Sequence, residues 1–89
     1  MESKIDLSLL SVRSLYMLRL LHKEPCLASQ LLKYSGLGKS ALYNRLYTFQ
    51  EQGWIGVKIV DKLRLPKQQF FLTEEGRAKV QELLKPLQL

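Results

Sequence analysis

The side chains able to carry acid-base, nucleophilic or metal chemistry are few in this chain and stand far apart. There is one histidine, His22, one cysteine, Cys26, and the acidic residues are scattered singly except for Glu74 and Glu75. His22 has no second His, Cys or carboxylate at the spacing of a zinc site. We therefore expect no enzyme, no bound metal and no cofactor.

One short run resembles the end of a nucleotide-binding phosphate loop. Gly36-Leu37-Gly38-Lys39-Ser40 has the closing Gly-Lys-Ser, but position 33, where the motif needs its first glycine, is a lysine. No strand pattern precedes the run, and a phosphate loop requires one. The sequence therefore argues against nucleotide chemistry.

Size and composition limit the remaining functions. The 89 residues, 46% of them hydrophobic, fit one small domain and leave no room for a separate effector-binding domain. The single cysteine suits a reducing, intracellular setting, because it cannot form an internal disulfide. No run of about 18 apolar residues is present, and the N-terminus does not read as a signal peptide. We expect a cytoplasmic protein with no membrane contact.

The stretch from Lys39 to Gln52 is the most informative, because it divides into an apolar and a polar helical face. Leu42, Leu46 and Phe49 recur at helical spacing and predict a stripe that faces the core. Hydroxyl, amide and cationic side chains occupy the other side and its flanks: Lys39, Ser40, Tyr43, Asn44, Arg45, Tyr47 and Thr48. Such groups suit contacts with base edges and phosphates. An ordinary solvated face is the alternative.

Two helical stretches precede the segment from Lys39 to Gln52. The first, Ser11 to Lys23, has Val12, Leu15, Leu18 and Leu21 on one side, with Leu10, Tyr16, Met17 and Leu20 spread round the other. Its surplus of apolar residues fits either a subunit interface or packing under the N-terminal segment. The second stretch runs from about Leu27 to Tyr34. Gly36 suits the left-handed end of this helix, and Gly38 suits a tight re-entry into the next one. Two helices joined by so short a turn predict a helix-turn-helix.

The pattern changes after Gly53. Residues 54–60 are rich in β-branched and aromatic side chains and predict a strand, and Phe70 to Leu72 predict a second, short one. The polar, basic run between them, Asp61 to Gln69, predicts the loop of a hairpin, and it contains Lys62, Arg64 and Lys67. Leu63 and Leu65 in that loop have no explanation beyond contact with each other or with a partner.

A final helix is expected from Glu74 to about Lys85, with Thr73 as its N-cap and Pro86 at its end. Its apolar stripe is Val80, Leu83, Leu84 and Leu87. The fold class is thus α+β, mainly α, in a single domain over residues 1–89. We divide it into an N-terminal arm (1–10), the first helix, helix-turn-helix and first strand (11–60), the wing (61–72) and the C-terminal helix (73–87).

Positive charge gathers in the middle of the chain. Residues 38–72 hold six basic and two acidic residues, whereas residues 73–89 hold three of each. Basic charge concentrated on a polar helix and a neighbouring hairpin is typical of nucleic-acid binding, because contacts with phosphates release condensed counterions. The partner we expect is double-stranded DNA.

The order of elements, with Gly53-Trp54-Ile55 after the polar helix and Leu72-Thr73-Glu74-Glu75-Gly76-Arg77 after the hairpin, resembles the winged helix-turn-helix proteins of the PadR-like and MarR-like regulators. The resemblance covers about residues 11–85. It implies a transcriptional regulator that binds a specific DNA sequence, usually as a homodimer. Here the dimer would form through the first helix, the N-terminal arm or the C-terminal helix.

The resemblance also implies roles for single residues. Lys39, Ser40, Tyr43, Asn44 and Tyr47 would enter the major groove, and Lys62, Arg64 and Lys67 would follow phosphates or reach a minor groove. Two matters stay open: whether a small molecule binds near Tyr16 and Trp54, where core packing is the simpler role, and whether the domain instead docks on a larger protein assembly without specific DNA binding.

Overall fold

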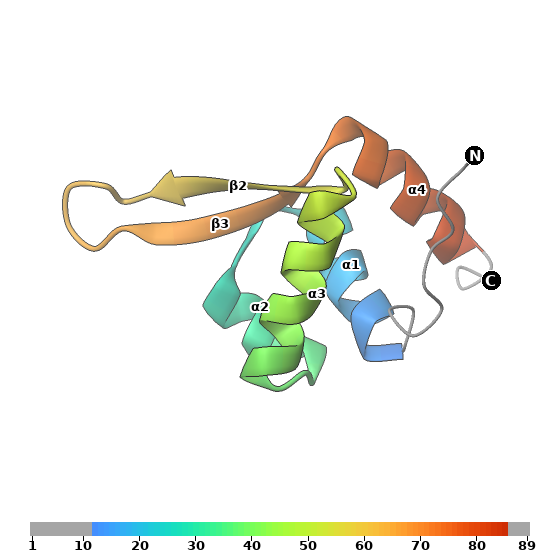
Figure 1. Cartoon of the computed structure of the whole chain (residues 1–89), viewed down its shortest axis with the longest axis horizontal. Coiled ribbons are helices and arrows are strands. Elements are labelled where there is room, and N and C mark those ends of the chain that lie inside the picture. The colour runs from blue at the N-terminus through green and yellow to red at the C-terminus, as the bar shows by residue number, and fades with distance from the viewer. Residues whose placement is uncertain (1–11, 86–89) are drawn as a thin grey trace.

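The computed structural model describes residues 12–85, which form a helical body with a long β-hairpin projecting from it (Figure 1). Along the chain the elements are α1 (Val12–Lys23), β1 (Cys26–Leu27), α2 (Ala28–Ser35), α3 (Lys39–Glu51), β2 (Ile55–Val60), β3 (Lys67–Leu72) and α4 (Glu74–Leu84). The predicted α+β winged helix-turn-helix fold is confirmed. The N-terminal arm, Ser11 and Leu87 lie outside the described residues.

The core is built where the predicted stripe of α3 meets the other helices and the sheet. Leu42, Leu46 and Phe49 are all fully buried. The ring of Phe49 stacks on Trp54, with 5.2 Å between the ring centroids and 20° between the planes. Burying such a side chain stabilises the fold by roughly 1.5–3 kcal/mol. Trp54 is therefore a core residue, as the simpler of its two expected roles requires, whereas Tyr16 is exposed.

The inward face of α1 differs from the predicted one. Met17, Leu18 and Leu21 are buried, together with the polar Ser14, whereas Val12 is 67% exposed. The true stripe is thus rotated by about one residue, and it includes a serine because that serine has a polar partner on α3. Met17 belongs to the core, and the exposed apolar side chains of α1 are Val12 and Tyr16.

The joint between α2 and α3 depends on one glycine rather than two. Gly36 adopts φ 78°, ψ 3°, the left-handed conformation that ends α2, and its carbonyl accepts a hydrogen bond from the guanidinium of Arg13 at 3.0 Å. Gly38 has φ −71° and ψ 165° at the N-cap of α3, an extended conformation open to any residue, and nothing lies within 4 Å of a Cβ placed there. Gly38 thus lies at the predicted re-entry into α3, but its conformation does not require glycine.

The sheet has three antiparallel strands in the order β1-β3-β2. The two-residue strand β1 pairs Cys26 with Phe70 and Leu27 with Gln69, and sequence patterns did not predict it because two residues show no alternation. Strand β3 also begins earlier than predicted. Lys67 pairs with Val60 and is the first residue of the strand, so the loop covers only residues 61–66.

The turn from β3 into α4 gives structural roles to the residues of the run from Leu72 to Arg77. The Thr73 hydroxyl accepts a hydrogen bond from the Gly76 N–H at 3.0 Å, which confirms the predicted N-cap. Gly76 is buried, and a Cβ there would lie 1.9 Å from the carbonyl oxygen of Trp54. Arg77 donates to the carbonyl of His22 at 3.0 Å and joins α4 to the end of α1. This run therefore fixes the hairpin and α4 on the helical body.

Candidate nucleic-acid interface

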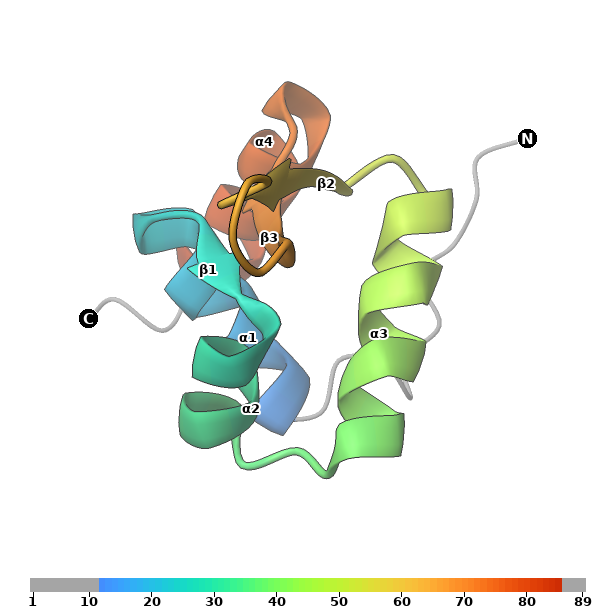
Figure 2. The same cartoon turned by 90° about the vertical axis from the view of Figure 1, so that its left-hand side faces the viewer.

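The polar face of α3 points away from the core. Because Leu42, Leu46 and Phe49 are buried, the opposite side chains must face outward. Figure 2 shows α3 set apart from the other labelled helices, with its C-terminal end leading into β2 of the wing. The exposed residues of the predicted set on α3 are Lys39, Ser40, Asn44 and Tyr47. They form a row of ammonium, hydroxyl and amide groups on a rigid helix.

Two tyrosines lie along this face. The ring centroids of Tyr43 and Tyr47 are 6.0 Å apart, and their planes are tilted by 38°. Tyr43 is half-buried and packs against the edge of the core, whereas Tyr47 is 54% exposed. A tyrosine fixed at its base and open at its hydroxyl is a well-positioned hydrogen-bonding group, because little rotamer freedom is left to lose on binding.

Arg45 has a different position from the rest of the predicted set. It is half-buried, and its Nε donates to the hydroxyl of the buried Ser14 on α1 at 3.1 Å. The guanidinium therefore ties α3 to α1. We infer that Arg45 supports the placement of the face, whatever contact its outer nitrogens make with a ligand.

The basic side chains of the wing are exposed. Lys62 and Arg64 lie in the loop 61–66, and Lys67 is at the start of β3. Asp61 has a positive φ of 57°, and its carbonyl accepts a hydrogen bond from the N–H of Arg64 at 3.3 Å. This bond closes a turn with Lys62 and Leu63 as its central residues.

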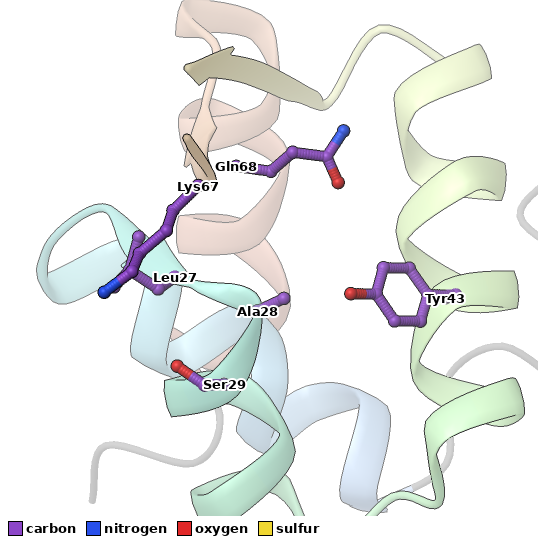
Figure 3. A pocket seen from close by; sticks show the side chains of 6 residues that line it. All are labelled: Leu27, Ala28, Ser29, Tyr43, Lys67 and Gln68. Atoms are coloured by element: carbon purple, nitrogen blue, oxygen red, sulfur yellow. The ribbon is translucent and has the colours of Figure 1, made fainter. Parts of the chain in front are cut away.

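An open pocket of about 270 Å³ lies between α2, α3 and the wing (Figure 3). It is lined by Leu27, Ala28, Ser29, Tyr43, Lys67 and Gln68. In Figure 3 the Tyr43 hydroxyl points from α3 toward Ala28, and the Gln68 amide lies on the α3 side of β3, whereas the amino group of Lys67 lies near Leu27. The pocket joins the polar face of α3 to the wing.

The structure adds three residues that the sequence analysis missed. Ser29 and Gln68 line the pocket, and Lys58 is exposed on β2, opposite Gln69. Strand alternation could have found Lys58 and Gln68 once the register was known. Ser29 could have been found from its place in the first turn of α2, where free N–H groups and small hydroxyls attract anions.

Other chemistry has little support among residues 12–85. No three side chains of the His, Cys, Asp and Glu types come together there as a metal site would require. Cys26 is buried, and burial, with a smaller effect of Glu24, raises the pKa of its thiol. A thiol with a raised pKa is a poor nucleophile. Within the same residues no helix is long and apolar enough to cross a membrane.

Comparison with known proteins gives matches at the level of structure. No family model matches the chain, and no curated sequence matches it. A PadR-like transcription factor from Bacteroides fragilis is 25% identical, with a TM-score of 0.69 over 82% of this chain and 77% of its own. A transcriptional regulator assigned to the MarR family, from Enterococcus faecalis, is 22% identical, with a TM-score of 0.71 over 91% of this chain and 76% of its own.

A third solved structure contains DNA. Bacillus subtilis PadR in complex with operator DNA is 20% identical to this chain, with a TM-score of 0.68 over 79% of this chain and 45% of that protein. This chain thus spans less than half of that PadR. All three proteins are named as transcription factors, regulators or PadR, and none is named as an enzyme. The chain has the winged-helix fold of PadR-like and MarR-like regulators.

Proposed function

We propose that this protein is a transcriptional regulator that binds a specific sequence of double-stranded DNA, with α3 in the major groove and the wing on the adjacent backbone or minor groove. The observation that supports this most directly is the outward polar face of α3, backed by a fully buried stripe. The major groove admits one α-helix and presents a distinct pattern of donors and acceptors for each base pair. Asn44, Tyr43 and Tyr47 would read base edges.

Phosphate contacts would come from the residues around this face. Lys39 and Ser40 lie in the first turn of α3, and Lys62, Arg64 and Lys67 extend the positive charge along the wing. In this proposal a phosphate backbone would pass between α3 and the wing, over the pocket that Ser29 and Gln68 help to line. The acidic residues of the span 39–67 are Glu51 and Asp61, so little negative charge opposes this path.

A homodimer is part of the proposal. Val12 and Tyr16 expose apolar surface on α1, and Figure 1 shows α4 at the end of the molecule away from the wing. Pairing through α1, α4 or the N-terminal arm leaves both wings free. Two recognition helices would then read half-sites about one helical turn, roughly 34 Å, apart. We place the dimer in the cytoplasm, where a regulator of this kind meets DNA.

Selection of bound duplexes from a randomised pool tests the proposal. We expect a short consensus with two related halves, bound with an affinity that falls steeply with salt. Enrichment of no sequence, together with equal binding of all duplexes, would contradict a sequence-specific role. Failure to shift any duplex at low salt would remove DNA from the proposal altogether.

A second candidate is a protein-interaction module that docks on a larger assembly. The observation in its favour is the wing tip, where Leu63 and Leu65 are exposed. This function predicts a stable complex with a protein partner and no duplex binding at low salt, so the same binding experiment separates the two candidates.

A further inference from the structure

The tip of the wing exposes apolar surface that the sequence did not explain. Leu63 is 100% exposed and Leu65 is 65% exposed, and both lie in a loop that also contains Lys62 and Arg64. No described residue covers either side chain to the extent expected of a leucine in a stable contact. Two exposed leucines this close together form an apolar tip rather than a single scattered residue, and neither adds much to the fold, so we look for their role in a contact with a partner.

The backbone of the loop holds Leu63 at the apex. The left-handed conformation of Asp61 (φ 57°) turns the chain, and the hydrogen bond from the Arg64 N–H to the Asp61 carbonyl closes it. Lys62 and Leu63 are the two central residues of this turn. The leucine is thus presented by a closed turn on a paired hairpin rather than by a loose loop.

The charges around the tip select the kind of partner. Lys62 and Arg64 flank Leu63 directly, and Lys67 follows at the start of β3. Asp61 is the single acidic residue of the loop, and its carboxylate precedes the apex. A second copy of this wing would be repelled by the same charges, whereas a polyanion with an apolar interior fits both the cations and the leucine. A duplex, with phosphates outside and stacked bases inside, is such a partner.

We propose that Leu63 is an apolar wedge that enters the minor groove beside the α3 site and separates a base step, so that the protein bends its DNA. Lys62 and Arg64 would hold the phosphates on the two sides of the groove while the leucine presses on the bases. Apolar side chains inserted in this way unstack a step and open the minor groove, which kinks the duplex toward the major groove. The inference rests on the proposed DNA-binding function and adds a bending activity to it.

The experiment uses the full chain and the duplex selected from the random pool, with 2-aminopurine placed in turn at each position outside the sequence bound by α3. At saturating protein we expect the fluorescence of one position to rise several-fold, since 2-aminopurine brightens when it unstacks. Leu63→Ala should abolish most of that rise and weaken binding by about tenfold. It should leave unchanged the salt slope, which is the slope of the logarithm of the binding constant against the logarithm of the salt concentration. End-labelled duplexes measured by energy transfer should show the bend shrink in parallel.

Lys62→Ala is the matched variant, one residue away in the same turn. It should lower the salt slope by about one unit and keep the 2-aminopurine signal at saturation. Specific binding without any 2-aminopurine response or bend in the wild type would overturn the wedge and leave the proposed function standing. Absence of specific duplex binding would overturn both. Leu63-dependent binding to equimolar phosphatidylcholine-phosphatidylglycerol vesicles, with an undiminished 2-aminopurine signal in Leu63→Ala, would assign the leucine to a membrane instead.

Discussion

An exposed asparagine at position 44 and an exposed lysine at position 62 should affect DNA binding in different ways. Asn44→Ala removes a group able to make two hydrogen bonds with one base, so we expect a loss of about 1–3 kcal/mol on the selected duplex and a relaxed base preference. Lys62→Ala removes a phosphate contact, so all duplexes should weaken similarly. Titrations at several salt concentrations, on selected and random duplexes, measure both.

Gln81→Ala is the control for that comparison, because Gln81 is an exposed amide on α4, far along the chain from the α3 face. It should leave both affinities unchanged. If Asn44→Ala weakened selected and random duplexes equally, Asn44 would have no part in reading the sequence, and Tyr43 would be the next residue to test.

Cys26 makes the stability of the protein depend on pH in the alkaline range. Burial raises the pKa of its thiol above the ordinary value of 9.0, so the folded state binds the proton more tightly than the unfolded state. The stability from this group is complete below the unfolded pKa and is lost as the pH rises through the folded pKa. We expect the free energy of unfolding to fall above about pH 9, by at most about 1.4 kcal/mol per pH unit from this one group.

Urea unfolding of the wild type and of Cys26→Ala, followed from neutral to alkaline pH, tests this. The variant should start lower, because it loses a buried side chain, but decline less steeply. Parallel declines would show that the Cys26 thiol does not cause the alkaline loss of stability.

At the scale of elements, the same change from glycine to serine should have opposite effects on stability at the two glycines of the helix-turn-helix joint. Gly36→Ser forces a residue with a Cβ into φ 78°, so we expect it to destabilise the fold by about 1–2 kcal/mol. Gly38→Ser supplies a hydroxyl at the N-cap of α3, where φ and ψ are already suitable, and should stabilise by about 0.5 kcal/mol. Thermal unfolding of both variants provides the measurement.

The space around the two glycines supports the comparison. A Cβ at Gly36 would lie 3.6 Å from the Arg13 side chain, an ordinary contact, so the cost there comes from the backbone and not from a clash. A Cβ at Gly38 would meet nothing within 4 Å. Destabilisation by Gly38→Ser comparable to that by Gly36→Ser would mean that the N-cap conformation of α3 needs glycine after all.

Elements with a strong local pattern could be predicted from the sequence, and those defined by long-range pairing could not. The α3 stripe, the left-handed Gly36 and the Thr73 cap are local signals, and each was found where it was expected. Strand β1 exists because Cys26 and Leu27 pair with a strand more than forty residues later, and no pattern within two residues reveals that. The early start of β3 has the same cause, since Lys67 and Gln68 join the sheet through β2.

For the whole molecule, the polar face of α3 could be predicted because a helix shows its two faces in its own sequence. The contact of Arg45 could not be predicted in this way, because only the packing of α1 against α3 brings Ser14 to its guanidinium. The pocket under the wing, with Ser29 and Gln68, also depends on the packing of three elements, so neither residue stood out in the sequence.

The outer face of α1 should decide whether the protein reads one half-site or two. Val12 and Tyr16 are exposed there, at 67% and 51%, outside the buried core of the described residues. Tyr16→Lys places a charge in the proposed interface, so sedimentation should change from twice the chain mass of 10.4 kDa to a single chain. On a duplex with both half-sites the variant should lose roughly hundredfold in affinity, because the two recognition helices are no longer linked. On a duplex with one half-site the variant should match the affinity of the wild type, since Tyr16 lies outside the α3 face. A wild type that sediments as a monomer would contradict the dimer proposed through α1.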